Sequence, residues 1–252
     1  NFRKFNLMAH TPTPRDRIDE WIIDRTPGRS FVDIGGIGVG AGNERTSTAA
    51  LAGATRVAQA DIRPIDYFEW EGFRQMLRSR GVDSVEEFDR IDIRDAAALS
   101  RLGQFDVVHT TGIFYHLPSP ADALWNLRRV AQRHLITNTV TFPGVISNAE
   151  GVLRLPDAGV LFLPALTAQD RRVLNRHYED KFGWSIDQTA PPLDRPNPGM
   201  PWIEDGELTC WPYWYLYTDH AFRKLLELCR FRVIDEFKWE DHTLQVLCEV
   251  IP

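Results

Sequence analysis

Three aspartates in the first half of the chain, Asp33, Asp61 and Asp92, stand at or near the ends of hydrophobic runs that are typical of buried β-strands. The carboxyl ends of parallel strands meet at one edge of a sheet, where ligands of open α/β sheets bind. A carboxylate there accepts hydrogen bonds from a ribose diol, an amino group or backbone amides. We expect Asp61 to bind a ribose and Asp92 an adenine amino group. Asp33 should meet an ammonium group or orient the next loop, and each aspartate taken alone could instead cap a loop.

A dense group of glycines follows Asp33 immediately. Its members are Gly35, Gly36, Gly38, Gly40 and Gly42. Because glycine has no Cβ, such a segment can turn sharply and let a ligand lie against the backbone. A strand, a glycine turn and a helix in succession are typical of a nucleotide-cofactor site. A glycine pattern alone is a weak signal, so a nicotinamide dinucleotide stays open as the ligand at this point.

A second group with chemical potential, Tyr115 and His116, lies in the stretch Gly112-Ile-Phe-Tyr-His-Leu-Pro-Ser-Pro120. Histidine titrates near neutral pH, so His116 is a candidate general base. Tyr115 could donate a hydrogen bond to an acceptor molecule or pack against a cofactor. The alternatives are that His116 caps the following loop or contacts the cofactor, and that Tyr115 is a purely packed side chain. His109, inside the preceding strand, is expected to be a buried structural histidine.

Strands that alternate with helices must position these groups. We predict strands over 31–34, 56–60, 88–93, 105–110 and 134–140. Helices should begin near Thr13-Pro14 and Ser119-Pro120, each with a proline in the first turn, and a third should begin at Thr218. Strand–helix alternation of this kind implies a parallel sheet with right-handed crossovers. The segments 231–237 and 244–250 alternate like two antiparallel strands joined by a tight turn.

The alternation breaks between residues 141 and 210, where we predict one helix near 168–178 and otherwise an inserted lid or substrate-specificity segment. Aromatic residues concentrate there and just beyond, and they could enclose an apolar or planar acceptor or form a second small core. They are Trp184, Trp202, Trp211, Tyr213, Trp214, Tyr215 and Tyr217. Four arginines could meet an acidic group on the acceptor, although solvated helix positions explain the first three equally well. They are Arg171, Arg172, Arg176 and Arg195.

The composition of the 252-residue chain is typical of a globular α/β protein. Its formal net charge of -6 argues against a general nucleic-acid binder. Three cysteines without metal spacing indicate a reduced, cytoplasmic setting, and we predict no metal ion. No apolar run reaches about 18 residues, so we predict no membrane partner. A homodimer is the one assembly that we consider.

Phe31-Val-Asp-Ile-Gly-Gly-Ile-Gly38, Asp61, Asp92 and the Gly112–Pro120 stretch resemble the class I S-adenosylmethionine (SAM)-dependent methyltransferases. The resemblance covers roughly residues 30–140 and the closing helix and strands. It implies a Rossmann-like sheet of seven strands, mostly parallel with an antiparallel last strand, and helices on both faces. It also implies SAM across the strand ends, S-adenosylhomocysteine (SAH) as product, and Tyr115 and His116 beside the reactive methyl group. One departure is Ile37, which occupies the position of the second glycine of the family's loop.

The resemblance implies a set of SAM-binding residues. They are Asp33, Gly35, Gly36, Gly38, Asp61, Ile62, Asp92, Ile93, Thr110 and Thr111. It also implies one domain over 1–252, divided into an N-terminal helix (14–30), a SAM-binding core (31–140), the lid (141–210) and a closing part (211–252).

The resulting hypothesis is a methyltransferase that acts on a small-molecule acceptor, most simply an O-methyltransferase of secondary metabolism. The first alternative is an RNA-modifying enzyme of the tRNA wobble-uridine carboxymethyl-transferring type, which the resemblance also includes. The acidic charge and the absence of a lysine-rich patch favour the small molecule. A nicotinamide-dependent oxidoreductase and a non-catalytic SAM-binding scaffold are the alternatives from other classes.

Overall fold

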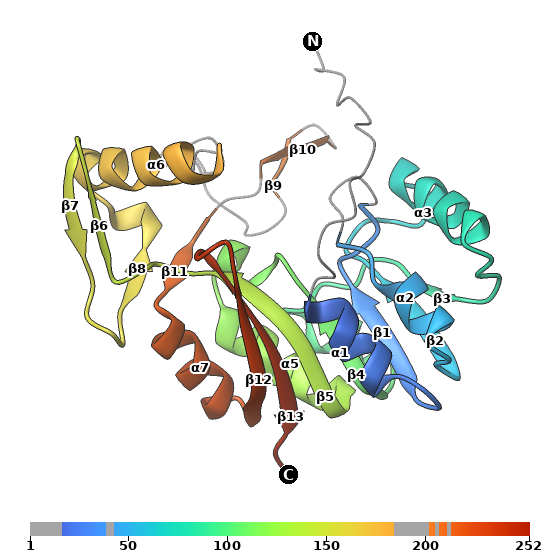
Figure 1. Cartoon of the computed structure of the whole chain (residues 1–252). Helices are drawn as coiled ribbons and strands as arrows, with labels where there is room; N and C mark the ends of the chain where they lie inside the picture. The colour runs from blue at the N-terminus through green and yellow to red at the C-terminus, as the bar shows by residue number, and fades with distance from the viewer. Residues whose placement is uncertain (1–16, 39–42, 184–201, 205–206, 211–212) are drawn as a thin grey trace.

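A seven-stranded sheet, in the order β12-β13-β5-β4-β1-β2-β3, forms the centre of this computed structural model (Figure 1). The structure describes residues 17–38, 43–183, 202–204, 207–210 and 213–252. The sheet strands are β1 (Ser30–Ile34), β2 (Arg56–Ala60), β3 (Glu86–Phe88), β4 (Phe105–Thr110), β5 (Ala131–Val140), β12 (Phe231–Trp239) and β13 (Thr243–Val250). Neighbouring strands from β3 to β5 pair in parallel, whereas β13 is antiparallel to both β5 and β12. This arrangement confirms the predicted mostly parallel sheet with an antiparallel last strand.

Helices cover both faces of the sheet, as Figure 1 shows. One face carries α1 (Arg17–Arg25), α2 (Thr46–Leu51) and α3 (Phe68–Ser79), and the other carries α4 (Ala96–Ser100), α5 (Pro120–Val130) and α7 (Asp219–Leu228). Successive side chains of a strand point to opposite faces. Accordingly, Phe31 of β1 packs in one cluster with Ile22 of α1, whereas Val32 packs in another with Leu124 of α5. The alternation therefore binds a helical layer to each face.

The third strand is the main error of the sequence prediction. It was expected over 88–93, but β3 ends at Phe88. Arg90 has a φ of 54°, which a strand residue does not adopt. Ile91 and Ile93 are buried in the core from a loop, so their alternation imitates a strand. Asp92 therefore lies on that loop and not at the strand's end.

The helix starts were predicted with mixed success. Thr218 caps α7 as expected, because its hydroxyl accepts a hydrogen bond from the Ala221 amide at 3.3 Å. Ser119 precedes α5 with Pro120 in the first turn, but its side chain makes no capping hydrogen bond. The expected cap at Thr13 lies outside the described residues. Among the described residues, no helix has the length and apolar content that crossing a bilayer requires.

The segment after β5 forms three small antiparallel pairs and a long helix. Its elements are β6 (Val145–Asn148), β7 (Gly151–Arg154), β8 (Val160–Phe162), the 3-10 turn η3 (Leu163–Ala165), α6 (Ala168–Phe182), β9 (Trp202–Glu204), β10 (Glu207–Cys210) and β11 (Tyr215–Tyr217). The pairs are β6 with β7, β8 with β11, and β9 with β10. Tyr178, Leu174 and Tyr213 help to form a separate hydrophobic core here. β11, which immediately precedes the Thr218 cap, is thus part of this segment and not of the main sheet.

Candidate active site

The backbone turns away from the sheet directly after β1, at Gly35 and Gly36. Gly35 has a φ of 91°, and a Cβ there would lie 2.7 Å from Cδ1 of Ile113. A Cβ on Gly36 would lie 2.9 Å from Cγ of Asp33. The positive φ of Gly35 and the closeness of Gly36 to the Asp33 carboxylate disfavour a side chain at either position, so local geometry favours both glycines. The turn brings the loop after β1 against the loop after β4, which carries Ile113.

Asp33 is buried beneath this turn, with a relative exposure of 1%. Its Oδ2 accepts a hydrogen bond from the Arg45 amide at 2.8 Å, and its Oδ1 lies 2.7 Å from Nδ1 of His109. The loop-orienting role, one of the two expected for Asp33, is the one that this geometry supports. His109, expected to be a buried structural residue, is the unforeseen partner, and only the pairing of β1 with β4 brings it there.

Ile37 explains why the glycine pattern departs from that of the family. Its side chain is fully buried and packs with Trp70 and Phe73 of α3. Its backbone N–H donates a hydrogen bond to the Asp61 carboxylate. Ile37 thus anchors the loop to α3, a task that a glycine could not perform. Gly38 is the last described residue before the gap, and Gly40 and Gly42 lie outside the described residues.

Asp61 follows β2 immediately, at the carboxyl edge of the sheet where it was predicted. Its relative exposure is 3%, and its Oδ1 accepts a hydrogen bond from the Arg63 amide at 3.0 Å. Burial, only partly offset by this bond and the Ile37 amide, raises the pKa of Asp61 to about 6. Raised pKa values of this kind cluster at functional sites. The neighbouring Ile62 is half-buried.

Asp92 lies on the loop after β3 and pairs with Arg94. The Arg94 guanidinium contacts both carboxylate oxygens, with Nε at 3.0 Å from Oδ1 and Nη2 at 2.6 Å from Oδ2. An adenine amino group would therefore share Asp92 with this cation. Ile93 is buried, and its carbonyl accepts a hydrogen bond from Nδ2 of Asn126 at 3.1 Å. Sequence reasoning identified Asp92 and Ile93 but missed Arg94 and Asn126, the latter because it lies on α5.

Thr110 ends β4 beside this edge, as predicted, Thr111 follows it directly, and both are buried. Within the described part of the chain, the Thr110 hydroxyl oxygen has no hydrogen-bond partner. A buried polar atom without a partner is uncommon in folded proteins and calls for a ligand or water. The next residue, Gly112, donates its N–H to Oδ1 of Asn138 at 2.7 Å.

Tyr115 and His116 lie in the 3-10 turn η2 (Phe114–His116), directly after β4. The Tyr115 ring stacks on Tyr213 at 4.9 Å with an interplanar angle of 12°. The His116 ring meets Tyr213 edge-on at 4.8 Å. Burial raises the pKa of Tyr115 to about 12, so its hydroxyl stays protonated at neutral pH and can donate but not act as a base. His116 is the residue of the pair that could accept a proton.

The inserted segment attaches directly to this turn. The Trp214 amide donates a hydrogen bond to the Tyr115 carbonyl at 2.8 Å, and the Leu163 amide donates to the Trp214 carbonyl at 3.0 Å. The expectation that aromatic residues of this segment reach the site therefore applies to Tyr213. Tyr215 and Tyr217 instead pack at the edge of the main core.

The arginines proposed to meet an acidic acceptor have other partners. Arg171 donates to the Leu163 carbonyl at 3.0 Å, and Arg176 pairs with Asp180 at 2.8 Å on the exposed side of α6. Arg172 pairs with Glu150 at 3.7 Å. Trp184, Arg195 and Trp211 lie outside the described residues, as does the side chain of Trp202.

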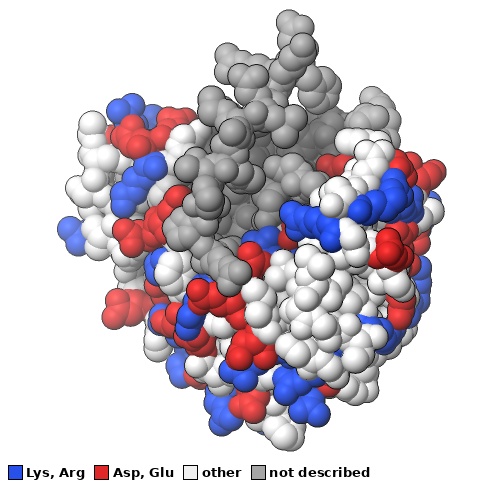
Figure 2. All heavy atoms as spheres, turned by 45° about the vertical axis from the view of Figure 1, so that its right-hand side comes forward, with Lys and Arg blue, Asp and Glu red and all other residues white. Residues whose placement is uncertain are grey.

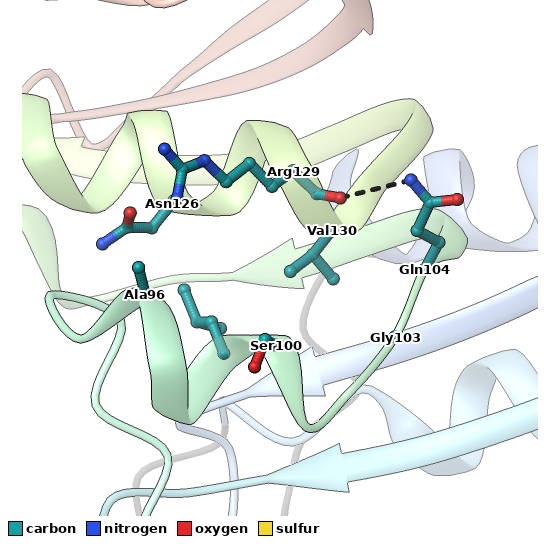
Figure 3. A pocket seen from close by; sticks show the side chains of 8 residues that line it. Ala96, Ser100, Gly103, Gln104, Asn126, Arg129 and Val130 are labelled. Carbon is teal, nitrogen blue, oxygen red and sulfur yellow. Dashed lines mark hydrogen bonds between the residues drawn. The ribbon is translucent and has the colours of Figure 1, made fainter.

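The surface gives two further observations. On the face in Figure 2, basic and acidic side chains are interspersed over the described residues. A pocket of about 250 Å³ lies between α4 and α5 (Figure 3). It is lined by Ala96, Leu99, Ser100, Gly103, Gln104, Asn126, Arg129 and Val130. Within the described ranges, no group of three or more His, Cys, Asp or Glu side chains is arranged to hold a metal ion.

Comparison with known proteins finds solved structures of the same fold but no similar sequence among family models or curated proteins. No family model and no curated protein matches the sequence. Several solved structures match the fold at low identity. Magnesium protoporphyrin IX methyltransferase from Synechocystis PCC 6803, with bound SAH, has a TM-score of 0.51 at 15% identity, covering 93% of this chain and 81% of that one.

Two further structures match equally well. The 1,6-didemethyltoxoflavin N1-methyltransferase from Burkholderia thailandensis, with its substrate and SAH bound, has a TM-score of 0.52 at 12% identity, covering 94% of this chain and 77% of that one. The N-terminal domain of EvdMO1 with SAH bound has a TM-score of 0.51 at 14% identity, covering 94% and 82%. The protein therefore has the fold of the class I SAM-dependent methyltransferases.

Proposed function

We propose that this protein is a SAM-dependent methyltransferase that acts on a small, planar acceptor. The observation that carries this proposal is the contact between the loops after β1 and β4. A Cβ on Gly112 would lie 3.4 Å from Nδ2 of Asn43, in the first loop, and 3.6 Å from the Tyr115 hydroxyl, in the second. The loop that follows Asp33 and the loop that carries Tyr115 therefore lie beside each other, which supports one shared site for methyl donor and acceptor.

The residues at the strand ends suit SAM in chemistry and in shape. Asp61 can accept hydrogen bonds from both ribose hydroxyls. Gly35 and Gly36 allow the turn that brings the loop after β1 against the loop after β4. The Thr110 hydroxyl, which has no partner among the described residues, can bind the polar amino-acid portion. Asp92 and Ile93 would bind the adenine. When bound there, SAM supplies an electrophilic methyl group on a sulfonium.

The residues around η2 suit an aromatic acceptor. The stacked rings of Tyr115 and Tyr213 form an apolar wall, and planar molecules pack well against such rings. We propose that His116 accepts the proton of an acceptor hydroxyl while Tyr115, which stays protonated, donates a hydrogen bond to it. Holding the acceptor in line with the donor would supply much of the rate. Oxygen as the attacking atom, and a place in secondary metabolism, are part of this proposal.

The tRNA alternative has less support. The formal net charge is -6, and charges of both signs alternate on the face in Figure 2. RNA binding depends mainly on basic contacts to phosphates. A cytoplasmic location and a homodimer remain predictions, and light scattering of the purified protein would test the second.

The test is a measurement of SAH release with a panel of phenols, heterocyclic amines and tRNA, combined with calorimetry of SAM and NADH. We expect SAM to bind, NADH not to bind, and a phenol to give turnover. His116→Ala should lower kcat by about 10²–10⁴-fold if the attacking atom is a hydroxyl oxygen. His220→Ala, at an exposed position of α7, is the matched control and should keep the wild-type rate.

Each rival has its own result. Turnover of a heterocyclic amine with a fully active His116→Ala variant would indicate nitrogen methylation without a base. Turnover only with tRNA would replace the small-molecule proposal. SAM binding without turnover of any acceptor would indicate a scaffold, and NADH binding alone would indicate an oxidoreductase.

A further inference from the structure

His109 and Asp33 form a pair in the interior of the sheet. Both residues have a relative exposure of 1%, and they stand opposite each other in the pairing of β1 with β4. The distance between His109 Nδ1 and Asp33 Oδ1 is 2.7 Å. The His109 ring also stacks on Phe31, two residues before Asp33, with a centroid distance of 6.3 Å and an interplanar angle of 17°. The imidazole is therefore held in place by both packing and hydrogen bonding.

The hydrogen-bond geometry assigns the proton of this pair. The Asp33 carboxylate can only accept, so Nδ1 of His109 donates to it. Nε2 has no partner within the described part of the chain. A proton on Nε2 would leave a buried donor unsatisfied, which is costly. We therefore assign the tautomer with the proton on Nδ1 and a lone pair on Nε2.

The hydrogen bond from His109 orients the Asp33 carboxylate towards the backbone that follows the glycine turn. With Oδ1 held by His109, the other oxygen of Asp33 faces the Arg45 amide at 2.8 Å and lies beneath Gly36. A second chain of hydrogen bonds reaches Asp33 at its backbone carbonyl. Thr46 donates to Gln59 at 2.6 Å, and Gln59 donates to the Asp33 carbonyl at 3.2 Å. The second connection ties α2 to β2, and only the first sets the direction of the Asp33 carboxylate.

We propose that His109 is a positioning residue for methyl-donor binding: it orients Asp33, and Asp33 fixes the glycine turn against which SAM lies. This inference rests on the proposed function. The hydrogen bond and the ring stacking of His109 go to Asp33 and Phe31 of β1, so it should influence SAM affinity and leave the chemical step nearly unchanged.

The test uses three substitutions at His109 and one elsewhere. His109→Asn keeps an N–H donor at the position of Nδ1, whereas His109→Gln moves the donor towards the position of Nε2 and His109→Leu removes it. His134→Leu is the control, because His134 is also a buried histidine of this sheet but stands nearer the opposite end of its strand. SAM affinity is measured by calorimetry, and kcat and KM by SAH release.

We expect Leu and Gln to weaken SAM binding by about tenfold to a hundredfold, the effect of losing one hydrogen bond to a charged group. Asn should restore affinity to within about threefold, and kcat should stay within about threefold in all variants that fold. His134→Leu should lower the melting temperature without changing SAM affinity. Wild-type affinity in the Gln variant, or no recovery in the Asn variant, would overturn the inference, and this pair decides even if the Leu variant does not fold.

A measurement on the wild-type protein separates this inference from the proposed function. Imidazole ¹⁵N spectra should show His109 protonated on Nδ1 and unprotonated on Nε2. A proton on Nε2 alone would overturn the inference whatever the ligand. If the tautomer is as assigned but the wild type binds no SAM, the proposed function fails, and with it the role of His109 in SAM binding.

Discussion

The strand ends of β1 and β2 contribute buried carboxylates to the candidate site, whereas the η2 turn and the inserted segment contribute aromatic rings. Backbone amides hold Asp33 and Asp61, and His109 also holds Asp33. The side of the site proposed for the methyl donor (the donor side) therefore depends on directional polar contacts. Tyr115, His116 and Tyr213 are held by ring contacts, which tolerate a change of shape. If the proposed function is right, we expect affinity for SAM to depend on a few directional hydrogen bonds and acceptor choice to depend on packed aromatic surface.

The largest effect should come from Gly35→Ala on the donor side. The alanine would have to adopt a φ of 91°, and its Cβ would lie 2.7 Å from Cδ1 of Ile113. We expect SAM affinity to fall by at least about a hundredfold and stability by about 1–3 kcal/mol. Gly53→Ala is the matched control, since Gly53 has a φ of 92° but nothing within 4 Å of the new Cβ. It should lose a similar amount of stability with unchanged SAM affinity, and equal affinity in both variants would contradict the role of the turn.

Asp61→Asn should weaken SAM binding while making the protein more stable. The loss of a charged acceptor predicts a fall in affinity of about tenfold to a hundredfold. The raised pKa of about 6 means that the unfolded carboxyl ionises at lower pH than the folded one. The free energy of unfolding therefore falls as pH rises towards 6, and the variant avoids this loss, gaining up to about 3 kcal/mol at pH 7.

Asp106→Asn is the control for Asp61→Asn and should have the opposite effect on stability. Burial acts against ionisation of Asp106, but hydrogen bonds from Ser30 and Arg133 outweigh it and lower its pKa. Removing that charge should destabilise the protein above the pKa and leave SAM affinity unchanged. Denaturant titrations at pH 4 and pH 7 would measure both variants, and a destabilised Asp61→Asn protein at pH 7 would refute the assignment.

The pH dependence of SAM binding should reflect the titration of Asp61. Ribose hydroxyls that donate to Asp61 favour its ionised form, so binding releases a proton when the pH lies below about 6. Affinity should therefore be constant above pH 7 and about tenfold weaker at pH 5. Calorimetry in buffers of different ionisation enthalpy would detect the proton, and Asp61→Asn should lose this pH dependence. An unchanged dependence in the variant would place the titrating group elsewhere.

The smallest effect should come from Tyr213→Leu on the acceptor side. Loss of the stacked ring predicts a rise of about threefold to tenfold in the KM of the acceptor, with SAM affinity unchanged. Phe162→Leu is the control, because Phe162 is an exposed aromatic of the same segment. A loss of SAM affinity in Tyr213→Leu would show that the two sides of the site are not separate.

Local patterns in the sequence were sufficient to predict most of the fold. The strands around Asp33, Asp61 and Thr110 and the cap at Thr218 follow from runs of neighbouring residues. The strand over 88–93 was wrong because Ile91 and Ile93 are buried from a loop. A loop with every second side chain buried has the same alternation of apolar and polar residues as a strand, and a single sequence does not distinguish the loop from the strand.

The site was predicted less completely, because its partners are distant in the sequence. Asp33 and the Tyr115–His116 turn were recognisable from motifs. His109, Asn126 and Tyr213 become partners only through strand pairing, helix packing and the return of the inserted segment. Their side chains carry no local signal of those contacts.

The inserted segment also leaves and re-enters the fold at a single point. Thr141 bridges to Tyr217, and the Phe142 amide donates to the Tyr217 carbonyl at 2.7 Å. Closing a loop between ends that already touch costs little more for a long segment than for a short one. The segment could therefore be exchanged for one of a different length while β5 and α7 stay in place. The Trp214 amide is hydrogen-bonded to the Tyr115 carbonyl, so an exchanged segment would also shift the turn that carries His116. Chimeras of this kind should therefore change in acceptor range and in reaction rate together.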